Sequence, residues 1–356
     1  MRDGQVSSVT TLIQLCGLAP WRKVLFTTYT ISLSFFEAFI LPCLEKVGCA
    51  DVLILVDQSF YLESLSERQA TSAGRGYRIV PVLMRTRGVF HPKLSYFWGE
   101  SNDVCAIGSG NMTYAGQGTN LECLDILSSL DDPGCFSDVS DLFSALLDSP
   151  SVFIAGERDR LTTYQERAKR QSRSVSDTNG AKVLHSLRQP IFPQIVEHLS
   201  KFRPIKRVTC MAPFHHPAGA PVFALAKQLG AAEVDIGLDP SDLSAPFDAS
   251  CLRKAGSKGR FVVLDSQDRR PLHAKWFEFE AEVSHVLTGS VNATNASLME
   301  TTNVEAVVLR KTNPSDVLKW IKKEPQSVRD GSFDRLQSVF TGYLTVSPRI
   351  TAVFPR

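Results

Sequence analysis

The sequence predicts a mixed α/β protein built from two similar lobes, and three observations support this prediction. Strand-like and helix-like stretches alternate along both halves of the 356-residue chain, as in mixed α/β layers. The order of these stretches is the same in each half. An unusual polar pattern also occurs once per half, at a nearly constant offset. A repeat of about half the chain is too long for a solenoid and indicates two domain-sized lobes.

The polar pattern is a His-x-Lys, then a Gly-Ser-x-Asn, then an Asn-x-Glu. Its two copies supply His91, Lys93, Ser109, Asn111 and Glu122, and then His273, Lys275, Ser290, Asn292 and Glu305. The two histidines are 182 residues apart and the two glutamates 183. A single His-x-Lys occurs by chance in many proteins. Two copies followed by the same residues in the same order indicate an internal duplication.

In the first half, β-branched and aromatic runs predict the strands. They are expected at residues 52–56, 77–84, 93–98, 104–109 and 121–127. Helices are expected at 31–47 and 138–147. The second half repeats this order, with strands expected at 208–214, 234–238, 261–265, 274–280, 284–290 and 304–310.

The stretch 155–185 is rich in charge and shows little apolar periodicity beyond a short helix, so it is expected to be an exposed connection. The predicted organisation is an N-terminal lobe over 1–150, a charged helical and loop connection over 151–204, and a C-terminal lobe over 205–356.

The formal net charge of +2 hides an uneven distribution. Residues 157–207 hold twelve Lys and Arg against five Asp and Glu, and residues 253–275 hold seven against two. The first block fits a solvated helix face as well as a binding surface. The second block leads into the second histidine, which favours attraction of an anionic substrate.

No secretory signal is expected, because the first fifteen residues lack an apolar core, and a cytoplasmic location is predicted. The apolar stretch 26–44 contains Glu37 and is interrupted by Pro42, so a buried strand and core helix are favoured over a membrane span. The eight cysteines form no CxxC pair, which favours reduced buried thiols over a metal site.

The chemistry follows from where these residues fall on strands. Residues two apart on a strand share a face, so each His and its Lys point the same way. The glycine allows close backbone approach, and the Ser and Asn supply neutral hydrogen-bonding groups. Two such sets related by a pseudo-twofold place two histidines on opposite sides of one phosphate. One imidazole can attack phosphorus while the other protonates the leaving oxygen, with no metal or cofactor.

These motifs resemble those of the phospholipase D superfamily, and through the duplication the resemblance covers nearly the whole chain. It implies a duplicated two-lobe phospholipase D fold, each lobe a mixed β-sheet flanked by helices, with one active site between the lobes. It also implies a phosphohistidine intermediate and no metal. Carried over by position, the catalytic residues are His91, Lys93, Asn111, Glu122, His273, Lys275, Asn292 and Glu305, and the phosphate-binding residues are Ser109 and Ser290.

One position departs from the pattern of the lipid-cleaving members, which carry an Asp five residues after the Lys. Trp98 and Glu280 occupy that position here. This resembles the tyrosyl-DNA phosphodiesterase and nuclease-like branch and shifts the prediction from lipid to nucleic acid. The symmetric pattern cannot identify the nucleophile. The resemblance to that branch assigns it to His91, with His273 as general acid and base, Glu305 behind His91 and Glu122 behind His273.

The predicted function is metal-independent cleavage of nucleic acid, with DNA favoured over RNA and with Arg269 and Arg270 as contacts to the phosphate backbone. By analogy, a helicase or other partner in a bacterial restriction or antiviral system would select the target. The sequence does not indicate the oligomeric state. The alternatives are a phospholipase or phosphatidyltransferase, a catalytically idle nucleic-acid-binding subunit, and a repair enzyme that removes adducts from DNA ends.

Overall fold

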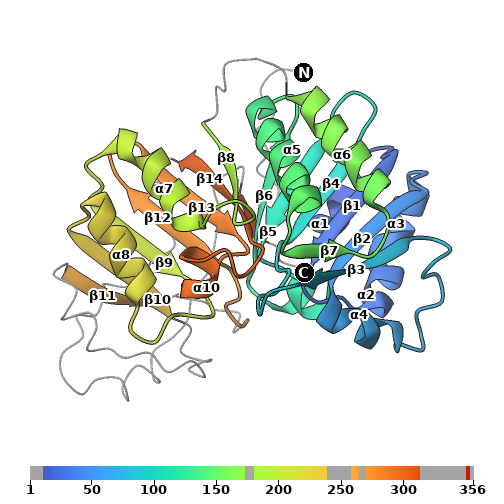
Figure 1. Ribbon diagram of the computed structural model, residues 1–356, viewed down its shortest axis with the longest axis horizontal. Coiled ribbons are helices and arrows are strands. Elements are labelled where there is room, and N and C mark those ends of the chain that lie inside the picture. Colours follow the sequence, from blue (N-terminus) through green and yellow to red (C-terminus); the bar gives the residue numbers. More distant parts are fainter. Residues whose placement is uncertain (1–10, 173–179, 239–257, 264–269, 313–349, 353–356) are drawn as a thin grey trace.

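The computed structural model describes residues 11–172, 180–238, 258–263, 270–312 and 350–352. These residues form two lobes that lie side by side, each containing one mixed β-sheet (Figure 1). The predicted fold class is therefore confirmed. Among the described residues, no helix has the length and apolar character that crossing a bilayer requires.

The first sheet has the strand order β15-β6-β5-β4-β1-β2-β3-β7. Its strands are β1 (Lys23–Thr28), β2 (Asp51–Asp57), β3 (Arg78–Met84), β4 (Leu94–Trp98), β5 (Val104–Gly108), β6 (Cys123–Ser128), β7 (Val152–Ile154) and β15 (Ile350–Ala352). The second sheet has the order β11-β10-β9-β12-β13-β14-β8. Its strands are β8 (Lys182–His185), β9 (Arg207–Met211), β10 (Glu233–Leu238), β11 (Lys258–Val263), β12 (Trp276–Glu280), β13 (Ser284–Gly289) and β14 (Ala306–Thr312).

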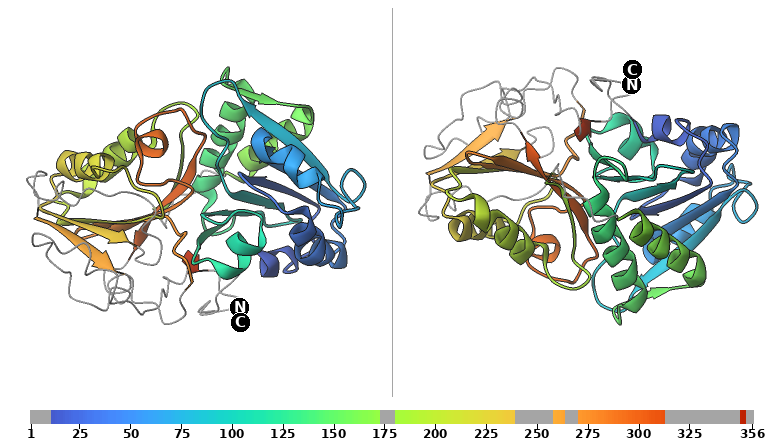
Figure 2. Two further views of the ribbon diagram at one scale, coloured as in Figure 1. Left: turned by 90° about the horizontal axis from the view of Figure 1, so that it is seen from below. Right: turned by 90° about the horizontal axis from the view of Figure 1, so that it is seen from above.

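The two sheets share one topology. The order β3-β2-β1-β4-β5-β6 in the first lobe matches β11-β10-β9-β12-β13-β14 in the second. In both, the first three strands are parallel and the next three join them antiparallel. In the first lobe, helices cover both faces of the sheet, and its central strands are accordingly apolar. Figure 2 shows this layering from below and above.

The helices, those predicted over 31–47 and 138–147 among them, lie between the strands along the chain. They are α1 (Leu12–Cys16), α2 (Leu33–Phe35), η1 (Phe36–Ile40), α3 (Leu41–Lys46), α4 (Gln58–Leu65), η2 (Ala115–Thr119), α5 (Pro133–Asp148), α6 (Arg158–Gln171), α7 (Ile191–Leu199), η3 (Ser200–Phe202), α8 (Ala220–Leu229) and α10 (Asn295–Leu298). The helix predicted over 31–47 is present as α2, η1 and α3 in succession. It begins where the Ser32 hydroxyl accepts from the amide of Phe35. Its middle turn is a π-helix.

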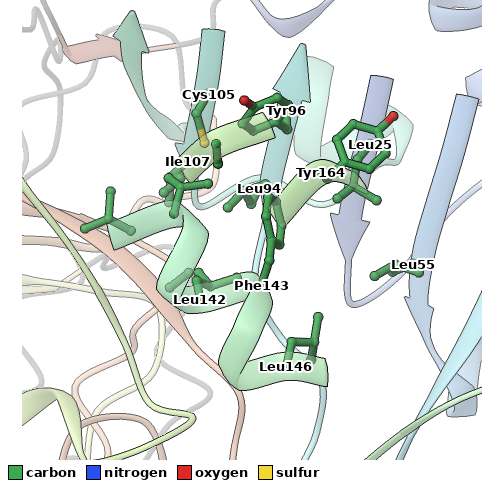
Figure 3. Close-up of a cluster of buried hydrophobic side chains, with 14 of the residues drawn as sticks. Leu25, Leu55, Leu94, Tyr96, Cys105, Ile107, Leu142, Phe143, Leu146 and Tyr164 are labelled. Atoms are coloured by element: carbon green, nitrogen blue, oxygen red, sulfur yellow. The ribbon is translucent and has the colours of Figure 1, made fainter. Parts of the chain in front are cut away.

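The described parts of the segment 151–204 contribute elements to both lobes, so the stretch 155–185 within it is more than the exposed connection that the sequence predicts. Helix α6 packs on α5 and buries Leu161, Tyr164 and Ala168 in the first core. The spacing of these residues forms one apolar stripe among many charges. Figure 3 shows Tyr164 beside Tyr96 and Phe143, with ring centroids 5.7 Å and 6.5 Å away. Strand β8 pairs with β14 in the second sheet, and α7 packs in the second core.

Several of the described basic residues in this segment are engaged in ion pairs. Arg160 pairs with Asp51 and Glu157. Arg167 lies 2.8 Å from Asp103 Oδ1, and farther along the chain Arg207 contacts three acidic groups. These pairs stabilise the lobes internally. They supply little free positive charge for a polyanion.

The lobes meet through two short backbone contacts that are related by the pseudo-twofold. Phe90 forms an isolated bridge with Val304, and Leu121 forms the matching bridge with Leu272. The first contact is tight, because a β-carbon at Gly88 would overlap the carbonyl of Thr302 in the opposite lobe. The two half-sites therefore lie at a seam with little tolerance for added atoms.

We expect Gly88→Ala to lower the free energy of unfolding by about 1–3 kcal/mol, because the added methyl group must push the two backbones apart. Gly118→Ala is the matched control, since a β-carbon at Gly118 would meet no atom within 4 Å. Urea unfolding monitored by tryptophan fluorescence measures both variants. Equal midpoints for the two variants would contradict the tight seam.

Candidate active site

Each histidine is positioned by a hydrogen bond to the opposite lobe. His91 and Lys93 immediately precede β4, and His273 and Lys275 immediately precede β12. The amide of His91 donates to the Val304 carbonyl at 3.0 Å, and that of His273 donates to the Leu121 carbonyl at 2.9 Å. The His-x-Lys segments are thus held at the seam, one on each side of the pseudo-twofold.

Each imidazole is also bound by a glutamate of the opposite lobe. His91 Nδ1 lies 2.9 Å from Glu305 Oε2, and His273 Nδ1 lies 2.6 Å from Glu122 Oε1. A carboxylate accepts the Nδ1 proton and so fixes the tautomer, which leaves Nε2 as the nitrogen available for chemistry. This is the pairing that the resemblance implies. The two half-sites are incomplete without each other.

The two lysines are buried beside the histidines. Lys93 Nζ donates to the His91 carbonyl at 2.8 Å, and Lys275 Nζ donates to the His273 carbonyl at 2.7 Å. Burial, and for Lys93 also the charge of Lys275, lowers the pKa of both ammonium groups. The pKa of Lys275 falls to about 8. Two mutually repelling cations buried at one seam favour the binding of an anion between them.

The same environment acts on the histidines. Burial, opposed by the charge of Glu305, lowers the pKa of His91 to about 4. Burial also lowers the pKa of His273, although the hydrogen bond that His273 donates to Glu122 opposes it. Both lysine ammonium groups add to the lowering at His273, and they do the same at His91. At neutral pH, without a bound anion, both imidazoles are therefore neutral.

The glutamates are held in their charged form. Although burial acts to raise the pKa of Glu122, its hydrogen bond and ion pair with His273 lower it overall. At Glu305, burial acts in the same way and is outweighed by the charge and hydrogen bond of His91. Carboxylates kept ionised in this way can stabilise an imidazolium when a proton is taken up during reaction.

The two serines do not fit the predicted role of binding phosphate. Ser109 Oγ donates to Glu122 Oε2 at 2.5 Å and accepts from the Cys123 amide at 2.8 Å. Ser290 Oγ donates in the same way to Glu305. A hydroxyl has one proton to donate, and here each proton is given to a glutamate. The serines therefore orient the carboxylates behind the histidines, and the prediction is corrected accordingly.

The motif glycines allow this close approach. A β-carbon at Gly108 would lie 2.5 Å from the Cys123 carbonyl oxygen, and one at Gly289 would lie 2.5 Å from the Ala306 carbonyl oxygen. Gly289 also has a φ of 143°, a conformation that L side chains rarely adopt. The glycines thus let each motif serine reach the strand that carries its glutamate.

The motif asparagines have side chains that remain available to a ligand. The Oδ1 atoms of Asn111 and Asn292 are both buried, and neither forms a hydrogen bond within the described part of the chain. Buried polar groups in native proteins nearly always have a partner. A water bound beside a phosphate would donate to these oxygens, while the Nδ2 groups of the two side chains can donate to the phosphate itself.

Tyr29 is a residue of this site that the sequence prediction missed. It directly follows β1, and its ring centroid lies 5.3 Å from that of His91 and 4.8 Å from that of Phe60. Lys93 Nζ lies 5.8 Å from the centroid of the same ring. At the matching position of the second lobe the sequence has Pro213, so the aromatic wall is specific to the first half-site.

Other predicted residues lie apart from this constellation or beyond the described residues. Arg269 is outside the described residues, and Arg270 is half-buried just before the second His-x-Lys. Trp98 and Glu280 are at the far ends of β4 and β12, and Glu280 forms an ion pair with Arg207. These two residues are therefore placed to support the strands rather than to contact a substrate.

Within the described ranges, no group of three or more His, Cys, Asp or Glu side chains has a metal-binding arrangement.

Solved structures share this fold, although no family model and no curated protein matches the sequence. The yeast tyrosyl-DNA phosphodiesterase is 13% identical, with a TM-score of 0.58 over 89% of this chain and 88% of that chain. A histidine-to-alanine mutant of the yeast enzyme, also 13% identical, gives a TM-score of 0.59 over 85% of each chain. At this identity the similarity concerns the fold, and it spans both lobes.

Proposed function

We propose that this chain, which has the two-lobed fold expected for the phospholipase D superfamily, is a metal-independent phosphodiesterase that cleaves nucleic acid. The observation that carries the proposal is the reciprocal pairing of His91 with Glu305 and His273 with Glu122 across the seam. It holds two imidazoles about a pseudo-twofold, each with Nε2 free of its glutamate. Two buried ammonium groups lie beside them.

The proposed reaction has two steps. In the first, Nε2 of one histidine attacks phosphorus, a P–N bond forms, the P–O bond to the leaving group breaks, and the second imidazolium protonates the leaving oxygen. In the second, that imidazole takes a proton from water, whose oxygen attacks phosphorus and breaks the P–N bond. Lys93 and Lys275 hold the non-bridging oxygens, where charge must be stabilised.

The two histidines are not equivalent, and their differences support His91 as the nucleophile. The side chain of His91 is 11% exposed, whereas that of His273 is 23% exposed. His91 has a pKa of about 4, so it is neutral as a nucleophile must be. The shorter bond between His273 and Glu122 suits a residue that must carry a proton.

The proposed substrate is DNA rather than lipid. The two yeast structures described above are named tyrosyl-DNA phosphodiesterase. The position of the Asp typical of lipid-cleaving members is occupied by Trp98 and Glu280. An enzyme that removes adducts from DNA ends would share all of this chemistry, and the fold similarity favours it as a second candidate.

We further propose a cytoplasmic location and a partner, such as a helicase of a restriction or antiviral system, that selects the target. This part of the proposal rests on analogy with nuclease-like proteins of similar motif. Copurification of a partner under native conditions tests it directly.

The substrate is tested with the purified chain in EDTA. Labelled single-stranded DNA, duplex DNA, RNA, a 3′-phosphotyrosyl oligonucleotide and phosphatidylcholine vesicles are offered in parallel. Cleavage of a DNA substrate supports the proposal. Cleavage of phosphatidylcholine alone would support a phospholipase, and binding of DNA without cleavage would support an idle subunit.

The pH dependence of kcat/KM should differ between two leaving groups. An alkyl leaving oxygen must be protonated by His273, whose pKa is below its ordinary value of 6.5. As the pH rises, kcat/KM for such a substrate should therefore begin to fall at a pH below the pKa of free imidazole. A p-nitrophenyl ester needs no acid, so its kcat/KM should persist until Lys275 loses its proton at a pKa of about 8. Initial rates on both esters between pH 4 and 10 measure this difference. Identical alkaline limbs would contradict the assignment of His273 as the acid.

A further inference from the structure

The two glutamates behind the histidines do not have the same number of hydrogen-bond donors. Glu305 accepts from His91 and from the Ser290 hydroxyl through Oε2. Its other oxygen, Oε1, accepts from the amide of Asn303 at 3.4 Å and from the hydroxyl of Ser297 at 3.0 Å. Ser297, at the third position of α10, is 2% exposed, so this hydroxyl is fixed by its surroundings.

The opposite glutamate lacks a counterpart of this last donor. Glu122 accepts from His273, from the Ser109 hydroxyl and from the amide of Asn120 at 3.4 Å. No other side chain in the described part of the molecule donates a hydrogen bond to it. Counted from the motif asparagines, the position of the extra serine corresponds to Gly116. A small pocket of about 20 Å³, lined by Gly116 and Glu122 among others, lies there and has room for water in place of a side-chain hydroxyl.

A carboxylate that accepts more hydrogen bonds has less charge to share with each donor. The Glu305 carboxylate is therefore the weaker acceptor for an imidazolium, and the Glu122 carboxylate is the stronger one. The bond lengths follow this order, at 2.9 Å for His91 and 2.6 Å for His273. The asymmetry of the donors thus predicts that His91 is the imidazole that is harder to protonate.

We propose that Ser297 is a positioning residue whose hydroxyl weakens the hold of Glu305 on a His91 imidazolium and so makes the first half-site the nucleophilic one. This inference deepens the proposed function and rests on it. The charged groups that face His91 are Glu305, Lys93 and Lys275. The two lysines lower the pKa of His91, which is the direction proposed for Ser297. Among the described side chains that donate to the two glutamates, Ser297 alone has no counterpart in the other half-site, whereas each lysine acts on both histidines.

The titration of His91 tests this inference without any substrate. In protein labelled at histidine with ¹³C and ¹⁵N, the His91 signal is the one absent from His91→Asn. Its pKa, about 4 in the unmodified chain, should rise by about 0.5–1 unit in Ser297→Ala, because Glu305 then binds the imidazolium more strongly. Ser297→Cys, which keeps a weak donor of similar size, should give a smaller rise.

Ser140→Ala is the matched control, because it removes another buried serine hydroxyl, which donates to the Gln165 carbonyl between α5 and α6 and is not among the groups that contact His91 or Glu305. It should leave the His91 titration unchanged. An unchanged or lowered His91 pKa in a folded Ser297→Ala protein would overturn the inference, whatever the activity. A raised pKa in a chain that cleaves no diester would support the hydrogen-bond effect and refute the proposed function alone.

Discussion

Replacing His91 with alanine should lower the rate of diester cleavage by about 10³-fold or more. The variant loses the nitrogen that attacks phosphorus, so only binding and charge stabilisation by the lysines remain. Binding of a labelled oligonucleotide should change little, because Lys93 and Lys275 are retained. Steady-state rates and fluorescence anisotropy measure the two effects separately.

His198→Gln is the control for this variant. His198 lies on α7 in the second lobe, beside Phe202 and His285 rather than beside the lysines. It should retain the rate of the unmodified chain. If His91→Ala also retained that rate, the two-histidine mechanism would be refuted.

Replacing Arg310 with alanine should lower the free energy of unfolding by about 3–5 kcal/mol. Arg310 on β14 of the second lobe reaches into the first lobe, where it lies 2.7 Å from Asp125 Oδ1 and 3.0 Å from Asp132 Oδ1. All three side chains are buried. Removing the cation would take away the guanidinium that both of these buried carboxylates contact at the lobe interface.

The matched control is Arg22→Ala, which breaks an ion pair of similar length with Glu100 on the surface. Those side chains are 62% and 75% exposed, so the expected loss is below about 1 kcal/mol. Urea unfolding of both variants gives the comparison. Equal losses would show that the buried cluster does not hold the lobes together.

The fold was predictable where the sequence pattern is local. The central strands are continuous β-branched runs, and the duplication predicts the same order of elements twice. A short helix was expected where α6 lies, but its packing in the core escaped prediction because its apolar stripe, Leu161, Tyr164 and Ala168, is only three residues among many charged ones. Strand β15 escaped it because Ile350–Ala352 pairs with β6, more than two hundred residues earlier in the chain.

The site was predictable to the extent that its residues belong to the repeated motif. The histidines, lysines and glutamates are named by that pattern, and the structure brings them together at the seam. The role of Ser109 was not predictable, because a hydroxyl bonds whatever acceptor the fold brings to it, and here that is Glu122. Tyr29 and Ser297 were missed for a similar reason. They belong to no motif, and only their positions in space reveal them.

The central claim is that one histidine forms a covalent bond to phosphorus and the other completes the reaction. An oligonucleotide 3′-p-nitrophenyl phosphate tests it most directly, with His273→Asn in EDTA, because this leaving group needs no acid while hydrolysis of the intermediate needs a base. The predicted result is a burst of one equivalent of p-nitrophenolate and an oligonucleotide attached to the peptide that contains His91. Steady turnover with no burst and no adduct, or an adduct on another residue, would contradict it.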